Sequence, residues 1–299
     1  MMLLCCAPML RAQIDEPVDL GRGDAVERYL ETLRLDRLLA VHLEQQVETL
    51  TGEARGLAAT RLASLYGKLL ESDKDPVLRR ELEQRSRALL KLVPPDQVDD
   101  LRLTIVKARY FQAERESQAS LLGATTPEED QQLAREFLEL LPDLRDIASG
   151  AQRDTRSLET RLRATNANID EAAARDELEI LRSRMSQARY YLGWAQVELA
   201  RLTGQSRHAE QAMEDFGWLL GSGGDREPSV DAVAPGLLGY SHVARAALGC
   251  ARAAALRGDD VNAKRWLDLV IDAGETLSED VHSQLLAHQI LVLSQAKRW

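Results

Sequence analysis

The stretch "AALGCARAAALRGDDVNAKRWLDLV", residues 246–270, decides the fold class. Small and apolar residues recur in it at helical spacing on both sides of Gly258 and Asp259, which mark a turn. The stretch therefore predicts two antiparallel helices, which we place at residues 236–257 and 259–274.

The rest of the chain shows the same alternation of apolar stripes and turns. Asp75 before Pro76 has the residue types that start a helix, and so does Thr126 before Pro127, with Glu129 placed to complete a capping box. Pro142 is expected to end a helix, because proline lacks the N–H that would continue it. The predicted pairs are residues 54–72 with 76–93, 97–118 with 127–141, and 185–203 with 206–220, and a further helix begins after Ser278.

A more polar stretch separates the two halves of the chain. Apolar residues form only a thin seam in residues 143–184, and a turn is expected near 166–168. This predicts a longer polar helix pair inserted in the middle, with an extended coiled coil as the alternative. The predicted organisation is helical repeats over 24–142, the inserted hairpin over 143–184, and helical repeats over 185–299, open to continuation beyond 299.

Residues 246–270 resemble a tetratricopeptide repeat (TPR), in which two antiparallel helices form one unit of a longer array. When the segment is aligned at its Gly-Asp turn, Ala251 and Ala263 take the two positions that the family keeps small. The resemblance implies an all-α, right-handed superhelical solenoid of antiparallel helix pairs. Its first helices would line an extended concave surface.

The resemblance covers residues 185–299 and, in a degenerate form, 54–142, where HEAT-like helical repeats are the alternative. Tyr191 and Trp194 take large positions of a first helix, so we interpret them as helix-packing residues rather than as a ligand pocket. Glu198 departs from the pattern, since it stands where the family has a large apolar residue.

The resemblance also implies which residues face a partner. Inward-facing positions of the motif fall on Arg245 and Arg252 in one unit and on Arg189 and Gln196 in another. Because arginine pairs well with carboxylates, a protein or peptide partner that carries an acidic segment is expected. The alternative is that these arginines are solvated on helix surfaces.

Composition argues against several other classes of function. The net charge is −10, with acidic and basic residues interspersed, so nucleic acid is not the expected partner. No apolar run is long enough to span a membrane after the N-terminus. The three cysteines form no CxxC pair, and the five histidines show no metal-ligand spacing. We therefore expect no metal, no cofactor and no catalytic activity.

The N-terminus, "MMLLCCAPMLRAQ", resembles a bacterial secretion signal cleaved after Ala12. Residues 1–23 are accordingly predicted to be an export segment and a tail, which would place the protein in the periplasm or cell envelope. No basic residue precedes the apolar run, and Leu10 is large for its position, so a cytoplasmic location is the alternative.

Taken as a whole, these features predict a non-catalytic scaffold for protein–protein contact. A structural subunit of a bacterial cell-envelope assembly, which would self-associate, is the first alternative. An enzyme whose site is not recognisable from the residue pattern is the second.

Overall fold

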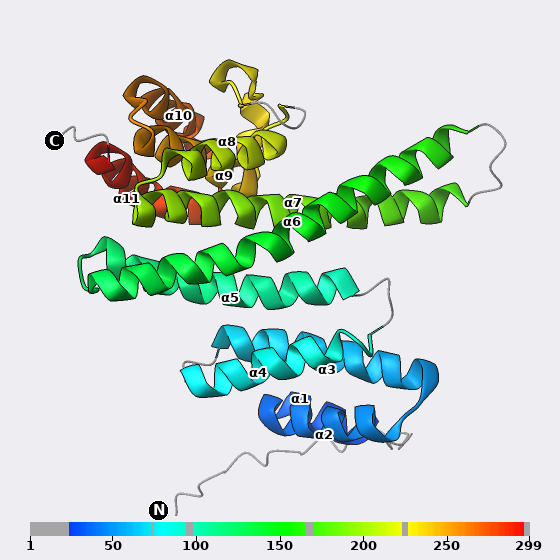
Figure 1. Ribbon diagram of the computed structural model, residues 1–299. Helices are drawn as coiled ribbons and strands as arrows, with labels where there is room; N and C mark the ends of the chain where they lie inside the picture. The colour runs from blue at the N-terminus through cyan, green and yellow to red at the C-terminus, as the bar shows by residue number, and fades with distance from the viewer. Residues whose placement is uncertain (1–23, 73–74, 94–97, 165–169, 223–226, 296–299) are drawn as a thin grey trace, which may run out of the picture.

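The computed structural model describes residues 24–72, 75–93, 98–164, 170–222 and 227–295. Across these ranges the protein is helical and contains no β-strand (Figure 1). The α-helices are α1 (Asp24–Thr32), α2 (Asp36–Thr49), α3 (Gly52–Ser72), α4 (Pro76–Leu89), α5 (Val98–Leu121), α6 (Pro127–Arg163), α7 (Glu171–Thr203), α8 (Ser206–Leu219), α9 (Ser241–Leu256), α10 (Asp260–Ala273) and α11 (Glu279–Gln295). Short 3-10 helices η2 (Val230–Ala232), η3 (Pro235–Gly239) and η4 (Gly274–Thr276) lie in the connections. The predicted all-α class is confirmed, whereas the predictions for 1–23 and for the turn at 166–168 lie outside the described residues.

Side-chain caps start two helices at the positions expected from the sequence. Asp75 accepts hydrogen bonds from two backbone N–H groups in the first turn of α4. Thr126 and Glu129 form a reciprocal capping box at the start of α6. Each cap satisfies N–H groups that the first turn of a helix leaves unpaired. The predicted helix starts at Pro76 and Pro127 are confirmed.

The predicted end of a helix at Pro142 is wrong, because α6 continues through this residue to Arg163. Proline removes one backbone hydrogen bond and costs roughly 3 kcal/mol in a helix interior. Leu141, Leu144 and Ile147 nevertheless continue the apolar stripe across the proline and are buried in the main core. This tertiary packing outweighs the local preference to end the helix.

α6 and α7 form a long antiparallel hairpin whose far end projects from the rest of the molecule (Figure 1). A small separate apolar cluster, Leu158, Ala174 and Leu181, holds the two helices together there. In the described part of this stretch, residues 143–163 and 171–184 are the distal parts of α6 and α7, so they are continuous with these two long helices and do not form a separate helix pair.

The helices pack in a regular alternating order. Each odd-numbered helix from α3 to α9 contacts the next odd-numbered helix, and the even-numbered helices from α4 to α10 each contact the odd-numbered helices before and after them. The odd-numbered helices α5, α7, α9 and α11 thus lie in one layer. One apolar core joins α2 to α5, and a larger one joins α5 to α11.

Close approach in the larger core depends on residues without a side chain. Phe216 of α8 is fully buried, and a Cβ atom on either Gly193 of α7 or Gly249 of α9 would overlap its ring. Ala251 and Ala263, the two positions expected to be small, are also buried. Phe216 therefore packs against two glycines on neighbouring helices, which lets α7, α8 and α9 pack closely.

Candidate functional site

A groove with a volume of about 790 Å³ runs across the layer of odd-numbered helices. We call it the central groove. It is lined by residues from α5, α7, α9 and α11 (Glu114, Ser117, Gln118, Leu121, Leu122, Tyr190, Trp194, Glu198, Arg245, Arg252, Gln284, Ala287, His288, Ile290, Leu291 and Ser294). Its volume lies in the range typical of ligand sites.

Arg252, one of the four residues predicted from the sequence to face a partner, lies in this groove. The side chain is only 4% exposed, so it is not the solvated arginine of the alternative interpretation. Its guanidinium group stands 5.7 Å from the centre of the Trp194 ring, a favourable cation–π position. Its Nη2 atom lies 3.0 Å from Oε1 of Glu198. Part of the charge of Arg252 is therefore already compensated within the protein.

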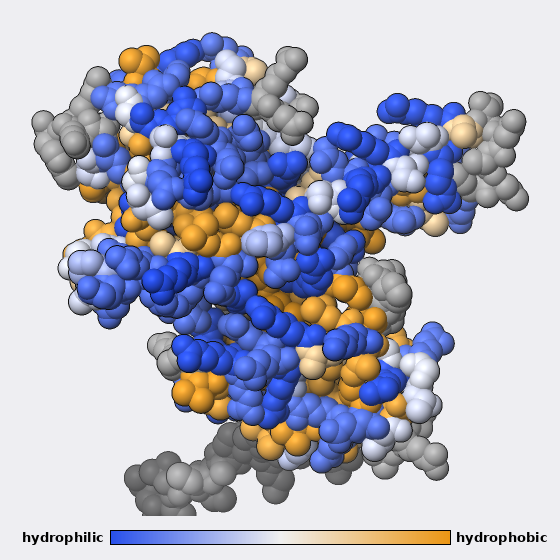
Figure 2. All heavy atoms as spheres, in the orientation of Figure 1, coloured by the Kyte–Doolittle hydropathy of each residue, from blue (hydrophilic) through white to orange (hydrophobic). Residues whose placement is uncertain are grey.

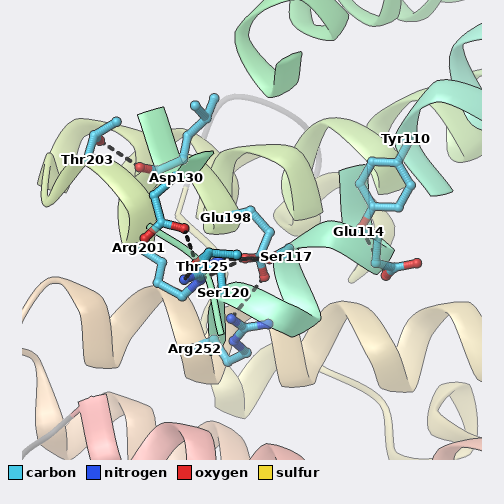
Figure 3. A network of polar contacts seen from close by, with 11 residues as sticks. Tyr110, Glu114, Ser117, Ser120, Thr125, Asp130, Glu198, Arg201, Thr203 and Arg252 are labelled. Atoms are coloured by element: carbon cyan, nitrogen blue, oxygen red, sulfur yellow. Dashed lines mark hydrogen bonds and ion pairs between the residues drawn. The ribbon is translucent and has the colours of Figure 1, made fainter. Parts of the chain in front are cut away.

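Glu198 is the centre of a buried polar network (Figure 3). Besides its contact with Arg252, this carboxylate accepts hydrogen bonds from the hydroxyl of Ser117 and from Nε of Arg201, the latter at 2.9 Å. Arg201 also donates to Ser117 and Ser120. Burial opposes the ionisation of Glu198, but the charges of Arg252 and Arg201 outweigh it, and the pKa of Glu198 lies below its ordinary value. The network thus holds an ionised carboxylate at the groove wall.

Glu198 was visible in the sequence only as a mismatch to the repeat motif. A glutamate in place of a large apolar residue on a buried helix face needs buried partners, since an unpaired buried charge is very unfavourable. That mismatch was the one signal in the sequence that could have indicated the network.

Arg245, the second predicted residue, also lines the groove. It lies about two helical turns before Arg252, on the same face of α9. Its Nη2 atom donates to Asp280 at the start of α11 at 2.9 Å. It also lines a second, adjoining cavity of about 480 Å³, which shares Tyr190 with the central groove and continues toward His242. Arg245 therefore stands between two parts of one extended concavity.

Gln196 and Arg189, the other two predicted residues, do not line the central groove. Gln196 is fully buried, donates to Gln211 at 2.8 Å and hydrogen-bonds with His208 at 2.6 Å. Arg189 donates to Asp215 at 2.8 Å. Both line a cavity between α6, α7 and α8, which we call the outer cavity. The expectation that all four residues share one partner-facing surface is therefore corrected.

Arg189 and Gln196 lie in the outer cavity because α7 is rotated about its axis relative to the orientation expected from the repeat motif. The residues of α7 in the groove are Tyr190, Trp194 and Glu198, spaced four apart. A shift of one position turns a helical side chain by about 100° around the axis, so a small error in register points a residue at a different neighbour. The interpretation of Trp194 as packing is incomplete for the same reason, because Trp194 is a core residue and a groove residue at once.

His288 of α11 is a groove residue that the sequence did not single out. Its ring packs against Trp194, with ring centres 5.7 Å apart. Burial and then the charges of Arg252 and Arg245 lower the pKa of His288 to about 4, so the imidazole is neutral at pH 7. On α5, burial raises the pKa of Glu114 above its ordinary value. The groove therefore holds two titratable groups that its surroundings disfavour in their charged forms.

Part of the groove lining is apolar. Leu121 at the end of α5, Leu122 directly after it, and Ile290 and Leu291 of α11 contribute this part. Leu122 is 85% exposed and adds to the accessible apolar surface. In Figure 2, apolar side chains gather in a band between the level of α5 and the level of α7. The groove thus combines two arginines held by ion pairs, Arg245 and Arg252, with an accessible apolar surface.

The groove offers charged, hydrogen-bonding and apolar side chains to a ligand. In the described part of the chain no group of three His, Cys, Asp or Glu side chains is arranged to hold a metal ion. The buried thiol of Cys250 lies outside the groove, and burial raises its pKa well above the ordinary value. A hydrogen-bonding and packing surface is what these residues form.

Comparisons with known proteins add no assignment to this geometry. The chain matches no family model, no curated protein and no solved structure. None of the helices within the described ranges is both long enough and apolar enough to cross a membrane. The function therefore has to be argued from the groove itself.

Proposed function

We propose that this protein is a non-catalytic scaffold for protein–protein contact, built from TPR-like helix pairs stacked as an α-solenoid, and that the central groove holds a segment of its partner. The observation that supports this proposal is that four successive odd-numbered helices, α5, α7, α9 and α11, line one continuous groove. A groove on the layer of first helices is the binding surface expected of such a solenoid.

The composition of the groove supports a protein partner rather than a small metabolite. Its volume, with the adjoining cavity along Tyr190 and Arg245, extends across several helices and remains open. Aromatic and arginine side chains, here Trp194 and Arg252, are the residue types that contribute most to protein interfaces. An acidic segment of the partner would complement the arginines.

The proposal is tested by blocking the groove without disturbing the core. Ala287 of α11 is exposed and lines the groove, so Ala287→Trp fills part of the groove from the surface. Ser283→Trp, one turn earlier on an exposed position outside the groove, is the matched control. Proteins captured from the native host by each tagged variant would be quantified by mass spectrometry. We expect partners to be lost from Ala287→Trp and retained by Ser283→Trp, and identical recovery by both would contradict the proposal.

A second candidate function, a self-associating assembly subunit, is favoured by an apolar surface of α11 that borders the central groove and shares Ile290 with it. Leu286, Ile290 and Leu293 of α11 are exposed at helical spacing and form an apolar stripe. Apolar stripes of this kind often mark contacts between protein chains. Light scattering distinguishes the two candidates: a ladder of oligomers that Leu286→Glu dissolves would favour assembly, and a monomer would favour the scaffold alone.

A further inference from the structure

We propose that the central groove recognises a segment in which an acidic side chain stands near a large apolar one, with the carboxylate received by Arg252 and His288 and the apolar side chain packed against Leu121 and Leu291. This inference rests on the proposed function and specifies the ligand of the same groove. It also predicts that binding takes up a proton.

The first step is the unused hydrogen-bonding capacity at the polar wall. Arg252 is almost completely buried, yet its Nε atom has no hydrogen-bond partner within the described ranges. Its Nη2 atom is close to Glu198 but makes no aligned hydrogen bond either. A buried donor without a partner is unfavourable, because it has lost its hydrogen bonds to water and gained none in return. A ligand that supplies an acceptor at this point would remove that penalty.

The second step is His288, which lies on the opposite helix and lines the same groove. Its Nδ1 atom is shielded from solvent and also lacks a hydrogen-bond partner in the part of the chain that the structure describes. Arg252 lies over the ring of Trp194, and the ring of His288 packs against the same indole at a tilt. Both side chains line one groove, and the charge of Arg252 acts on His288, so we assign one carboxylate to the two of them.

The third step is why the ligand group is a carboxylate and not a neutral carbonyl. The charged groups acting on His288 are Arg245 and Arg252 of α9 and Glu198 of α7, while Glu114 of α5 lines the same groove. No charged residue of α10 is among the groove residues in the described ranges. The charge of Glu198 is already compensated within the protein, by an ion pair with Arg252 and hydrogen bonds from Arg201 and Ser117. An incoming anion would satisfy Arg252 and would also stabilise a protonated His288.

The fourth step is the proton. His288 is held neutral by burial and by the neighbouring arginines, which lower its pKa to about 4. A carboxylate bound beside it reverses this balance and raises the pKa, since an opposite charge favours the protonated imidazole. Binding therefore takes up a proton, and affinity should rise as pH falls.

The fifth step is the apolar neighbour of the carboxylate. Leu121, Leu122, Ile290 and Leu291 line the groove with exposed or partly exposed leucine and isoleucine surface. A buried anchor beside a fixed polar contact is the usual arrangement at a protein-binding hot spot. A large apolar side chain close to the acidic residue would cover this surface.

The test uses pools of acetylated, amidated ten-residue peptides retained on the immobilised protein and counted by mass spectrometry. One pool has Glu fixed at the centre and Leu two positions later, with the other positions randomised. The second pool has Gln in place of Glu, the third has Ser in place of Leu, and the fourth has the central Gln with a free C-terminal carboxylate. We expect the first pool to be enriched about tenfold over the second, as the loss of one charge-assisted hydrogen bond implies, and about tenfold over the third, as the loss of one buried leucine side chain implies. Enrichment of the fourth pool instead would assign the site to a chain-terminal carboxylate and overturn the side-chain proposal.

Protein variants separate the groove from nonspecific charge. Arg252→Lys keeps the positive charge beside Glu198 but removes Nε, and His288→Gln keeps a polar side chain without a titrating proton. Each should reduce the preference for Glu over Gln at least fivefold. Arg265→Gln, on the exposed surface of α10 where Arg265 pairs with Asp231, is the matched control and should leave the preference unchanged.

The proton is tested with the most enriched peptide of the first pool. Its dissociation constant should be at least threefold lower at pH 5.5 than at pH 7.5, and His288→Gln should abolish this difference. Arg265→Gln, which lies outside the groove, should preserve the difference, because the proton is assigned to His288. If the wild type retained the Glu and Gln pools equally and the Ala287→Trp variant retained neither, this inference would be overturned but the proposed scaffold function would still hold. Retention of every pool by Ala287→Trp would contradict both.

Discussion

The polar groups buried on the two sides of α7 are paired to different extents. On the outer side, Gln196 hydrogen-bonds with His208 and Gln211, and Arg189 pairs with Asp215 through Nη1, while its Nε atom has no partner among the described residues. On the groove side, Glu198 is hydrogen-bonded and ion-paired, yet Nε and Nη2 of Arg252 and Nδ1 of His288 have no hydrogen-bond partner in the described part of the chain. Buried polar groups that satisfy one another fix the packing of helices, whereas buried donors left over beside an open groove are available to a ligand. The difference separates a structural polar cluster from a binding site on the same helix.

The largest expected effect comes from breaking the groove-side network at its centre. Glu198→Ala would leave the charges of Arg252 and Arg201 without their common carboxylate. Removing one partner of a buried ion pair typically lowers the free energy of unfolding by about 3–5 kcal/mol. Urea unfolding followed by circular dichroism would measure the loss. A loss below about 1 kcal/mol would mean that the network is solvated and not buried as described.

The second prediction is that stability responds to pH in opposite directions through Asp215, on the outer side of α7, and His288, on the groove side. Asp215 has its pKa raised to about 6 by burial, so its contribution to stability is present at low pH and is lost as pH rises from about 4 to 6. His288 has its pKa lowered to about 4, so its contribution is present above about pH 6.5 and is lost as pH falls toward 4. Each effect amounts to at most about 3 kcal/mol.

Unfolding free energies of the wild type, Asp215→Asn and His288→Gln, measured from pH 3.5 to 8, would separate these two contributions. As pH rises, the free energy of unfolding of the wild type should fall relative to that of Asp215→Asn. As pH falls, the free energy of unfolding of the wild type should fall relative to that of His288→Gln. Two differences that stay flat over this range would show that neither group is buried as the structure places it.

A smaller effect is expected at the outer cavity. Gln196→Leu removes both hydrogen bonds of Gln196 and leaves His208 and Gln211 to find other partners. We expect the free energy of unfolding to fall by about 1–3 kcal/mol, with partner binding unchanged. Thermal unfolding and the capture experiment together would check this, and a loss of partner binding would place the outer cavity within the interface.

The smallest change in stability is expected for Arg245→Ala. Its ion pair with Asp280 is partly exposed, and such pairs contribute about 0–1 kcal/mol. Partner recovery should nevertheless fall, because Arg245 joins the two parts of the groove. A variant that loses stability but keeps its partner would reverse the roles assigned here.

The sequence predicted the parts of this fold that local chemistry determines. The caps at Asp75 and Thr126 place their helices correctly because an N-cap acts within a single turn. The end expected at Pro142 was wrong because a long-range apolar contact with α7 outweighed a local signal. Local patterns reveal helix starts, but the length of a helix depends on what it packs against.

The candidate site was only partly predictable for a related reason. Arg245 and Arg252 reach the groove, since the repeat register of α9 could be aligned at the Gly258 turn. Arg189 and Gln196 do not reach it, because the register of α7 had no such marker and a small rotation faces them toward α8. His288 belongs to a helix whose contact with Trp194 joins residues far apart in the chain, which no local pattern reveals.

The central claim is that partners bind in the groove and not at the other polar cluster of α7. Site-specific photo-cross-linking tests it directly, with the cross-linking residue placed at Gln284 in the groove or at Glu214 beside the outer cavity, both exposed positions. In the native host, we predict a discrete partner adduct from Gln284 and none from Glu214. The same adduct from both positions, or from Glu214 alone, would contradict the account.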